Sequence, residues 1–153
     1  MDRNLVGALT NLAQCRLYAG SIEEVIPLAE QAIRLSPRDP GICHCYYWIG
    51  TVHLLQSRID QAIVWLEKAR SAVPAQPFYH SRLAAAYALR GEIERAAAEL
   101  AEARRLEAGG LFSSISRLKA FPGAGAWRGV PRIRALYEAT YFAGLRKAGM
   151  PEE

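Results

Sequence analysis

Three stretches of this sequence can be laid on one another at a spacing of 34 to 37 residues. The matching positions carry similar residues in each stretch: Gly20, Ser57 and Gly91; Ile22, Ile59 and Ile93; Ala32, Ala69 and Ala103; and Pro37, Pro74 and Ala108. A repeat of about 34 residues is typical of helix-turn-helix units that stack on one another and do not close into a globule. Such stacks present extended surfaces to other chains, so the repeat constrains the function as well as the fold.

Each stretch carries the pattern of two packed helices. Apolar residues recur at helical spacing, as in Ile59, Ile63 and Leu66. Small residues fall where the two helices of a unit are expected to cross, at Ala13, Gly50 and Ala84. Gly and Pro predict turns at Ala19-Gly20, Ser36-Pro37, Val73-Pro74 and Arg90-Gly91.

The second helix of the first unit has two signals of its own. Ser21 and Glu24 have the spacing of a capping box, which predicts the helix start. Pro27 then lies inside that helix, where a proline removes a hydrogen bond and costs about 3 kcal/mol. We therefore expect a bend at Pro27.

These stretches resemble the tetratricopeptide repeat (TPR), with units at residues 6–39, 43–76 and 77–110. The middle unit shows the pattern best, with an aromatic residue, a small residue at the crossing and a closing proline: Tyr46, Ile49-Gly50, His53, Ala62, Leu66, Ala69 and Pro74. The resemblance covers about two thirds of the chain. It implies an all-α, right-handed TPR-like solenoid of three helix-turn-helix repeats.

Residues 111–153 depart from the repeat. A short helix is expected at 111–119, a Gly/Pro-rich loop at 121–130, and a second helix from Pro131 to about Lys147. The apolar stripes of the two helices are Leu111, Phe112, Ile115 and Leu118, and then Ile133, Leu136, Tyr137, Tyr141 and Leu145. Solenoids need a terminal element over their last apolar face, so we expect these helices to form a C-terminal cap.

Length and charge favour one globular domain with a basic C-terminal half. The chain has 153 residues, of which 22% are charged, and a net charge of +4. Residues 1–76 carry seven basic and seven acidic side chains, whereas Leu111 to Lys147 contains seven Arg or Lys and one acid, Glu138. We expect these charges to lie on a solvated helix face. Contact with nucleic acid or with an acidic partner is a less favoured explanation.

The sequence predicts a cytoplasmic protein. It contains no run of 18 apolar residues and begins without the apolar segment of a signal peptide. Three cysteines, an odd number in a helical chain, favour reduced thiols. We therefore expect no contact with a membrane.

Several residues with catalytic or metal-binding chemistry are better explained by packing. Cys43-His44-Cys45 contains ligand types for zinc, but neighbouring residues on a helix point about 100° apart and do not readily share one ion. His53 and His80 occupy positions that aromatic residues take in the repeat, without a matching nucleophile and acid. The glycines of GAGAWRG at 123–129 lack the strand and lysine of a phosphate loop. We expect no catalytic residue, cofactor or metal.

The best candidate for a binding site is the groove that the resemblance places along the first helices. Its candidate residues are Tyr18, His44, Tyr47, Leu54, Phe78, Arg82 and Leu89. Only Arg82 matches the positions that bind a carboxylate in chaperone-binding members of the family. Aromatic and aliphatic groups suit an amphipathic helix or a hydrophobic segment instead. Alternatively, some of these side chains pack against the neighbouring unit. Truncation of Tyr47, Phe78 or Arg82 is expected to weaken binding and leave the fold intact.

Two short segments extend the resemblance to a narrower group. SPRDP at 36–40 and GLRKAGMPEE at 144–153 resemble the C-terminal TPR region of bacterial class III adenylate cyclase-like proteins and winged-helix signalling regulators. This implies a non-catalytic protein-protein interaction scaffold that regulates a signalling protein, with a protein, a peptide or other domains of a parent protein as the partner. Two alternatives stay open: the C-terminal part of a cyclase-like enzyme whose catalytic domain lies outside this chain, and a homodimerisation module.

Overall fold

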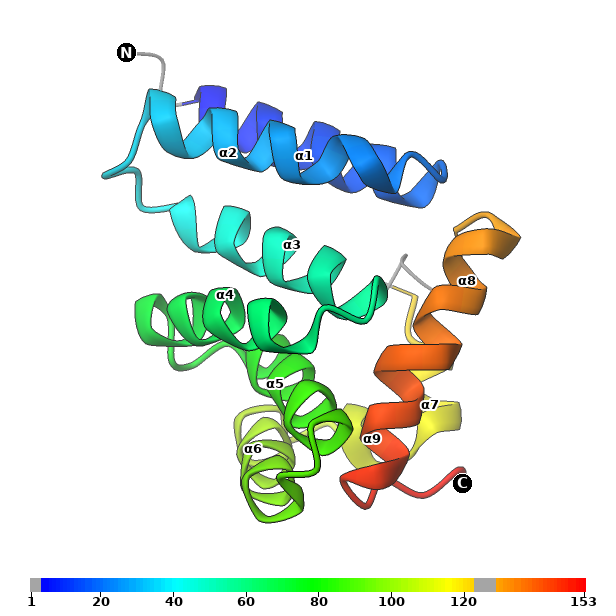
Figure 1. The fold of residues 1–153 in the computed structure, drawn as a ribbon. Helices are drawn as coiled ribbons and strands as arrows, with labels where there is room; N and C mark the ends of the chain where they lie inside the picture. Colours follow the sequence, from blue (N-terminus) through cyan, green and yellow to red (C-terminus); the bar gives the residue numbers. More distant parts are fainter. Residues whose placement is uncertain (1–3, 123–128) are drawn as a thin grey trace.

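In a computed structural model that describes residues 4–122 and 129–153, all regular elements are helical. Six helices form three consecutive pairs: α1 (Asn4–Tyr18) with α2 (Val25–Leu35), α3 (Ile42–Leu55) with α4 (Ile59–Ala72), and α5 (Pro77–Leu89) with α6 (Ile93–Leu106). Each helix contacts the next along the chain, and α3 also contacts α1 and α5 (Figure 1). The predicted all-α TPR-like solenoid is confirmed.

The repeat register is explained by backbone conformation at the turns. Gly20, Ser57 and Gly91 follow the first helix of each pair with φ angles of 98°, 61° and 90°. In each case the next residue donates its N–H to a helix carbonyl five positions back: Ser21 to Arg16, Arg58 to His53 and Glu92 to Tyr87, at 2.8, 2.8 and 2.9 Å. This left-handed helix end favours glycine.

The small residues predicted at the helix crossings lie there. A Cβ atom on Gly50 would stand 2.6 Å from Cγ of Leu66 on α4. The residues at the same register position in the other pairs, Ala13 and Ala84, are fully buried. Each pair can therefore pack closely only while this position stays small.

The start of α2 differs from the sequence prediction. A 3₁₀ turn, η1 (Ile22–Glu24), precedes the α-helix, and the side chain of Ser21 makes no capping hydrogen bond, so the predicted capping box is wrong. Because α2 begins at Val25, Pro27 lies in its first turn, where an N–H group would have no partner within the helix. The sequence predicts a bend at Pro27, whereas the irregular backbone here is the 3₁₀ turn η1, which precedes the proline.

The segment predicted as one helix at 111–119 is two elements. The 3₁₀ turn η2 (Leu111–Ser113) and the helix α7 (Ile115–Ala120) are separated by Ser114, which is extended. The Ser114 hydroxyl accepts the N–H of Arg117 at 3.3 Å and so caps α7. Of the loop predicted at 121–130, and of the GAGAWRG motif within it, residues 123–128 lie outside the described part of the chain.

The last helix runs from Pro131 to Lys147, as the sequence predicts. It consists of α8 (Pro131–Tyr137), a π-helical segment η4 (Glu138–Phe142) and α9 (Ala143–Lys147), hereafter the C-terminal helix. Gly149, with φ 105°, ends it, and the N–H of Met150 bonds the carbonyl of Leu145 at 3.0 Å. Figure 1 shows this helix, in orange to red, beside the stacked pairs.

The apolar core follows this arrangement. One large cluster joins all three pairs to η2, α7 and the C-terminal helix, and a smaller one lies between the first pair and α3. Over residues 4–122 and 129–153, none of the helices combines the length and the apolar character that crossing a membrane requires.

Ser57 is the non-glycine residue that takes up the left-handed conformation in this register, and replacing it should raise stability. We expect Ser57→Gly to increase the free energy of unfolding by about 0.5–1 kcal/mol, because a side chain at positive φ costs about 1 kcal/mol or more. The measurement is urea denaturation followed by circular dichroism.

The matched control is Gly91→Ser, which makes the reverse change in the third pair. No atom lies within 4 Å of a Cβ placed on Gly91, so the loss of about 1 kcal/mol expected there comes from the backbone alone. A Ser57→Gly variant less stable than the parent chain would contradict this account of the register.

Candidate functional site

The first helices of the three pairs form a surface that the C-terminal helix covers. We call the surface formed by α1, α3 and α5 the inner face. The η4 segment contacts α3 and α5, and α9 contacts α5. At the other end the N–H of Val130 bonds the carbonyl of Tyr18 at 3.1 Å, and Arg132 donates to the carbonyl of Gly20 at 3.2 Å. The helix therefore spans the inner face from the first pair to the third.

Arg82 on α5 is enclosed by three tyrosines where these helices meet. Its guanidinium carbon lies 3.8 Å from the ring centroid of Tyr141, 5.3 Å from that of Tyr137 and 5.5 Å from that of Tyr47. Beside it the hydroxyls of Ser81 and Tyr141 are 2.8 Å apart. We call Tyr47, Tyr137 and Tyr141 the tyrosine cage. Two of its members come from the C-terminal helix and one from α3.

The cage holds a positive charge that is almost fully withdrawn from water. Arg82 is 2% exposed, and its Nε and Nη1 atoms have no hydrogen-bond partner in the described part of the chain. The negative faces of aromatic rings offset part of the desolvation cost, with about 0.5–2 kcal/mol for each close cation-π contact. Burial raises the pKa of Tyr137 and of Tyr141, while the charge of Arg82 acts in the opposite direction. Both tyrosines are therefore neutral hydroxyls at physiological pH.

The fit of the C-terminal helix depends on a glycine. A Cβ atom on Gly144 would lie 2.5 Å from the carbonyl oxygen and 2.8 Å from the Cβ of Ala85 on α5. Tyr141 and Leu145, on either side of this contact, are fully buried. The inner face thus accepts a helix that presents aromatic residues and then a residue without a side chain.

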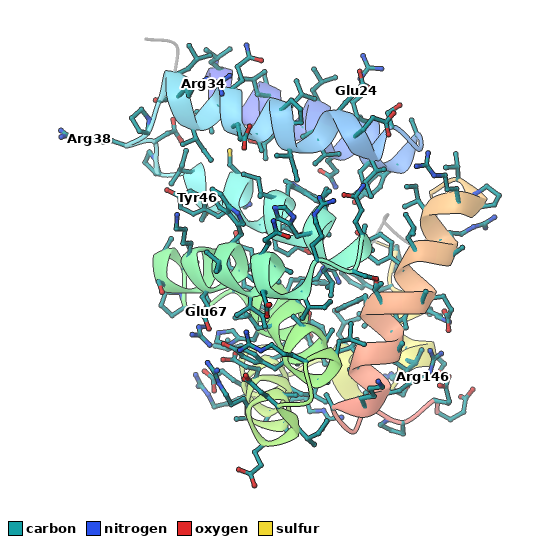
Figure 2. The ribbon with its side chains drawn as sticks, viewed as in Figure 1. Glu24, Arg34, Arg38, Tyr46, Glu67 and Arg146 are labelled. Carbon is teal, nitrogen blue, oxygen red and sulfur yellow. The ribbon has the colours of Figure 1, made fainter. Side chains whose placement is uncertain are left out.

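The last residues of the chain make contacts with both α7 and the C-terminal helix. The N–H groups of Ile115 and Ser116, at the start of α7, donate to the carbonyls of Pro151 and Glu152, both at 2.9 Å. Arg146, labelled in Figure 2, pairs with Glu152 and with Glu138, the latter at 2.7 Å. Residues 149–153 therefore join α7 to the C-terminal helix.

The structure brings two of the predicted groove residues together and distributes the others. Tyr47 and Arg82 meet in the tyrosine cage, and Tyr18 lies half-buried near them, accepting a hydrogen bond from Gln14 at 2.8 Å. Phe78 packs instead against the rings of Phe112 and Phe121.

The remaining predicted positions have three different environments. Leu54 is fully buried, and Leu89 is partly buried against the core. His44 is exposed, and its Nδ1 atom is 3.4 Å from the Tyr79 hydroxyl.

Sequence reasoning missed the contribution of Tyr137, Tyr141 and Gly144 to this site. Tyr137 and Tyr141 belong to the predicted apolar stripe of the last helix, but the sequence placed that stripe over the end of the stack. A signal was present in the sequence of α5, where residues 79–88 include one charged side chain, Arg82, and the structure buries all ten of them. A helix without a solvated face needs neighbours on all sides, and α4 and α6 provide only two.

The other chemically suggestive residues have local structural partners. The Nδ1 atom of His53 accepts a hydrogen bond from Arg58 Nε at 2.8 Å, and burial, followed by the charge of Arg58, lowers the pKa of His53. The two ring nitrogens of His80 each lie 2.6 Å from an oxygen, one of Glu99 on α6 and one of the Pro74 carbonyl. Both histidines join neighbouring segments of the solenoid.

Cys43 and Cys45 do not point toward a common metal site. Cys43 lies 3.9 Å from the carbonyl of Pro40, and Cys45 lies 3.9 Å from the hydroxyl of Thr10. Within the described ranges, no three His, Cys, Asp or Glu side chains are grouped so that they could hold a metal ion.

Known structures share this architecture. The fold is similar to that of an O-GlcNAc transferase variant from Thermobaculum terrenum, with a TM-score of 0.64 and 18% identity over 72% of this chain and 23% of that one. It is also similar to MamA, with a TM-score of 0.61 and 18% identity over 96% of this chain and 78% of that one. The chain thus spans about a quarter of the O-GlcNAc transferase. No protein-family model and no curated protein matches the sequence.

Because Arg82 is enclosed, its truncation should affect the fold as well as any binding. We expect Arg82→Ala to lower the free energy of unfolding by about 2 kcal/mol or more, through the cavity left inside the tyrosine cage. Arg82→Met, which keeps most of the volume and removes the buried charge, should lose less. Urea denaturation midpoints of both variants give the comparison, and an unchanged midpoint for Arg82→Ala would contradict the enclosed position.

Proposed function

We propose that this chain is a non-catalytic protein-interaction scaffold whose inner face binds an amphipathic helix. The observation that carries the proposal is the C-terminal helix itself, which lies across α3 and α5 with Tyr141 stacked on Arg82. A surface that holds one helix with aromatic and small-residue contacts is chemically suited to a second helix of the same kind. A partner would then compete with the chain's own helix for the inner face.

The contacts of the C-terminal helix define the chemistry of such a partner. Tyr137, Tyr141 and Gly144 are spaced at i, i+4 and i+7 in the sequence, and across the π-helical segment η4 all three contact α5. A competing helix should present two aromatic residues and one glycine at this spacing. An acidic side chain beside them would add charge-assisted hydrogen bonds to the Nε and Nη1 atoms of Arg82.

The candidate groove residues divide into two sets under this proposal. His44, Phe78, Leu89 and Tyr18 are exposed or partly exposed and can be reached while the C-terminal helix is in place. Tyr47, Leu54 and Arg82 are buried, and of these Tyr47 and Arg82 lie in the tyrosine cage, so they become available only when that helix moves. A partner that uses the second set therefore has to displace the helix, which makes binding conditional.

Narrower proposals rest on the sequence resemblance at 36–40 and 144–153. They make the scaffold a regulatory module of a bacterial signalling protein, with other parts of a parent protein as its partner. The proposed cytoplasmic location rests instead on the three cysteines and on the lack of a long apolar run. Two side chains of the segment 144–153 also have intramolecular roles, since Met150 is buried and Glu152 pairs with Arg146. Light scattering on the purified chain separates a monomeric scaffold from the homodimerisation alternative, and the full reading frame reveals any cyclase-like domain.

Weakening the chain's own helix should expose the inner face to a matching helix. We expect Gly144→Val to bind a labelled peptide of residues 131–147 about tenfold or more tightly than the parent chain does. The added side chain would overlap Ala85, and overpacking of this kind costs about 1–3 kcal/mol. The intramolecular helix otherwise competes at a high effective concentration. Fluorescence anisotropy measures the affinities, and circular dichroism checks that the variant remains folded.

The control is Ala139→Val, which places the same side chain at an exposed position of the same helix. It should leave peptide binding at the level of the parent chain. A second control is a peptide with Tyr141→Ala, which should bind Gly144→Val more weakly. Equal binding of the peptide to all three proteins, with the variants folded, would exclude the inner face as its site.

A further inference from the structure

The outward side of α1 carries a surface that the other first helices bury. The repeat spacing aligns three α1 residues, Ala8, Leu12 and Cys15, with Cys45, Ile49 and Val52 of α3 and with Tyr79, Leu83 and Ala86 of α5. The six residues on α3 and α5 are at most 2% exposed. In α1, Leu12 is 41% exposed, and Ala8 and Cys15 are exposed as well. We call Ala8, Leu12 and Cys15 the α1 face.

Both α3 and α5 contact the second helix of the pair that precedes them. The helix α2 contacts α3, and α4 contacts α5. On α3 the buried residues Cys45 and Ile49 form one cluster with Ala29 and Ala32 of α2, with Ile26 and Ile33 packed at its edge. The α1 face therefore occupies the repeat positions that, in α3 and again in α5, belong to a helix in contact with the preceding pair.

The composition of α1 also differs from that of a helix adapted to water. Its 15 residues include one charged side chain, Arg16, although six residues besides Arg16 are exposed. By contrast α6, at the other end of the stack, carries six charged residues among 14. A helix on the edge of a domain normally has a charged outer face, so α1 is suited to contact with protein.

We infer that the α1 face docks an amphipathic helix that presents an apolar stripe like that of α2, and that this helix continues the solenoid at its N-terminal end. The occupant is a protein helix with alanines three residues apart, as in Ala29 and Ala32, flanked by isoleucine-sized side chains. The surface is independent of the inner face and of the proposed function, since the hydrogen bonds described between the C-terminal segment and the first pair are made at Tyr18 and Gly20, at the far end of α1 from Ala8.

Cys15 provides a direct measure of whether this face is covered. It is the exposed one of the three free cysteines, whereas Cys43 and Cys45 are buried. The test adds a second copy of residues 21–41 directly before Leu5, the position that corresponds to Ile42. The linker then leads into α1 as it normally leads into α3. We expect the rate at which Cys15 reacts with a disulfide reagent to fall at least tenfold, and the melting temperature to rise.

Leu12→Glu is the matched variant. In the chain without the added helix it should leave the melting temperature unchanged, because Leu12 is exposed, whereas in the extended chain it should restore the reactivity of Cys15. Ala29→Glu in the added copy alone should restore it equally. Undiminished Cys15 reactivity in the extended chain would overturn the inference. So would concentration-dependent protection of Cys15 in the original chain, abolished by Leu12→Glu, which would indicate self-association.

Discussion

The contact between the C-terminal helix and the inner face is the constraint on which the rest of the structure depends. Three stacked helix pairs leave α3 and α5 with one apolar side, which the C-terminal helix contacts through η4 on α3 and through η4 and α9 on α5. Gly144 allows the close approach to Ala85, while Tyr137 and Tyr141 enclose Arg82. The same helix supplies the hydrogen bonds that join residues 130 and 132 to the end of α1.

The tyrosine cage buries a charged side chain without satisfying all of its hydrogen-bond donors. Its rings give Arg82 a packed, water-excluded environment, yet two of the arginine's nitrogen atoms keep their hydrogen-bonding capacity. A buried donor without an acceptor costs about 1–3 kcal/mol. This cost lowers the stability of the closed arrangement relative to one in which a partner supplies an oxygen. Under the proposed function, this difference would favour exchange of the C-terminal helix for a partner helix that carries such an oxygen.

The sequence predicts the solenoid because its signals are local. Left-handed turns require glycine or a small polar residue, which sets Gly20, Ser57 and Gly91 in register, and helix crossings require Gly50 and its alanine counterparts. The extent of the C-terminal helix is likewise local, since Pro131 and the apolar stripe mark it. The capping box at Ser21 was predicted wrongly because the spacing of Ser and Glu does not fix the backbone geometry that a cap needs.

The candidate site was harder to predict because it depends on contacts between distant segments. Tyr47 and Arg82 follow from the repeat register, but the other two rings around Arg82 lie 55 and 59 residues further along the chain, at Tyr137 and Tyr141. An apolar stripe shows that a helix is covered on one side without showing by which surface. The continuous burial of α5 shows that another element covers it besides α4 and α6, but no local signal in the sequence identifies that element.

The bond between Arg132 and Gly20, residues 112 positions apart in sequence, has a consequence for folding. In an ordinary repeat array each unit contacts only its neighbours, so folding can start anywhere and spread. Here the last helix connects the first pair to the third, which raises the mean sequence separation of contacts and slows folding. During synthesis the inner face stays uncovered until residues 131–147 have left the ribosome. A nascent chain therefore presents this apolar surface to its surroundings before it can bury it.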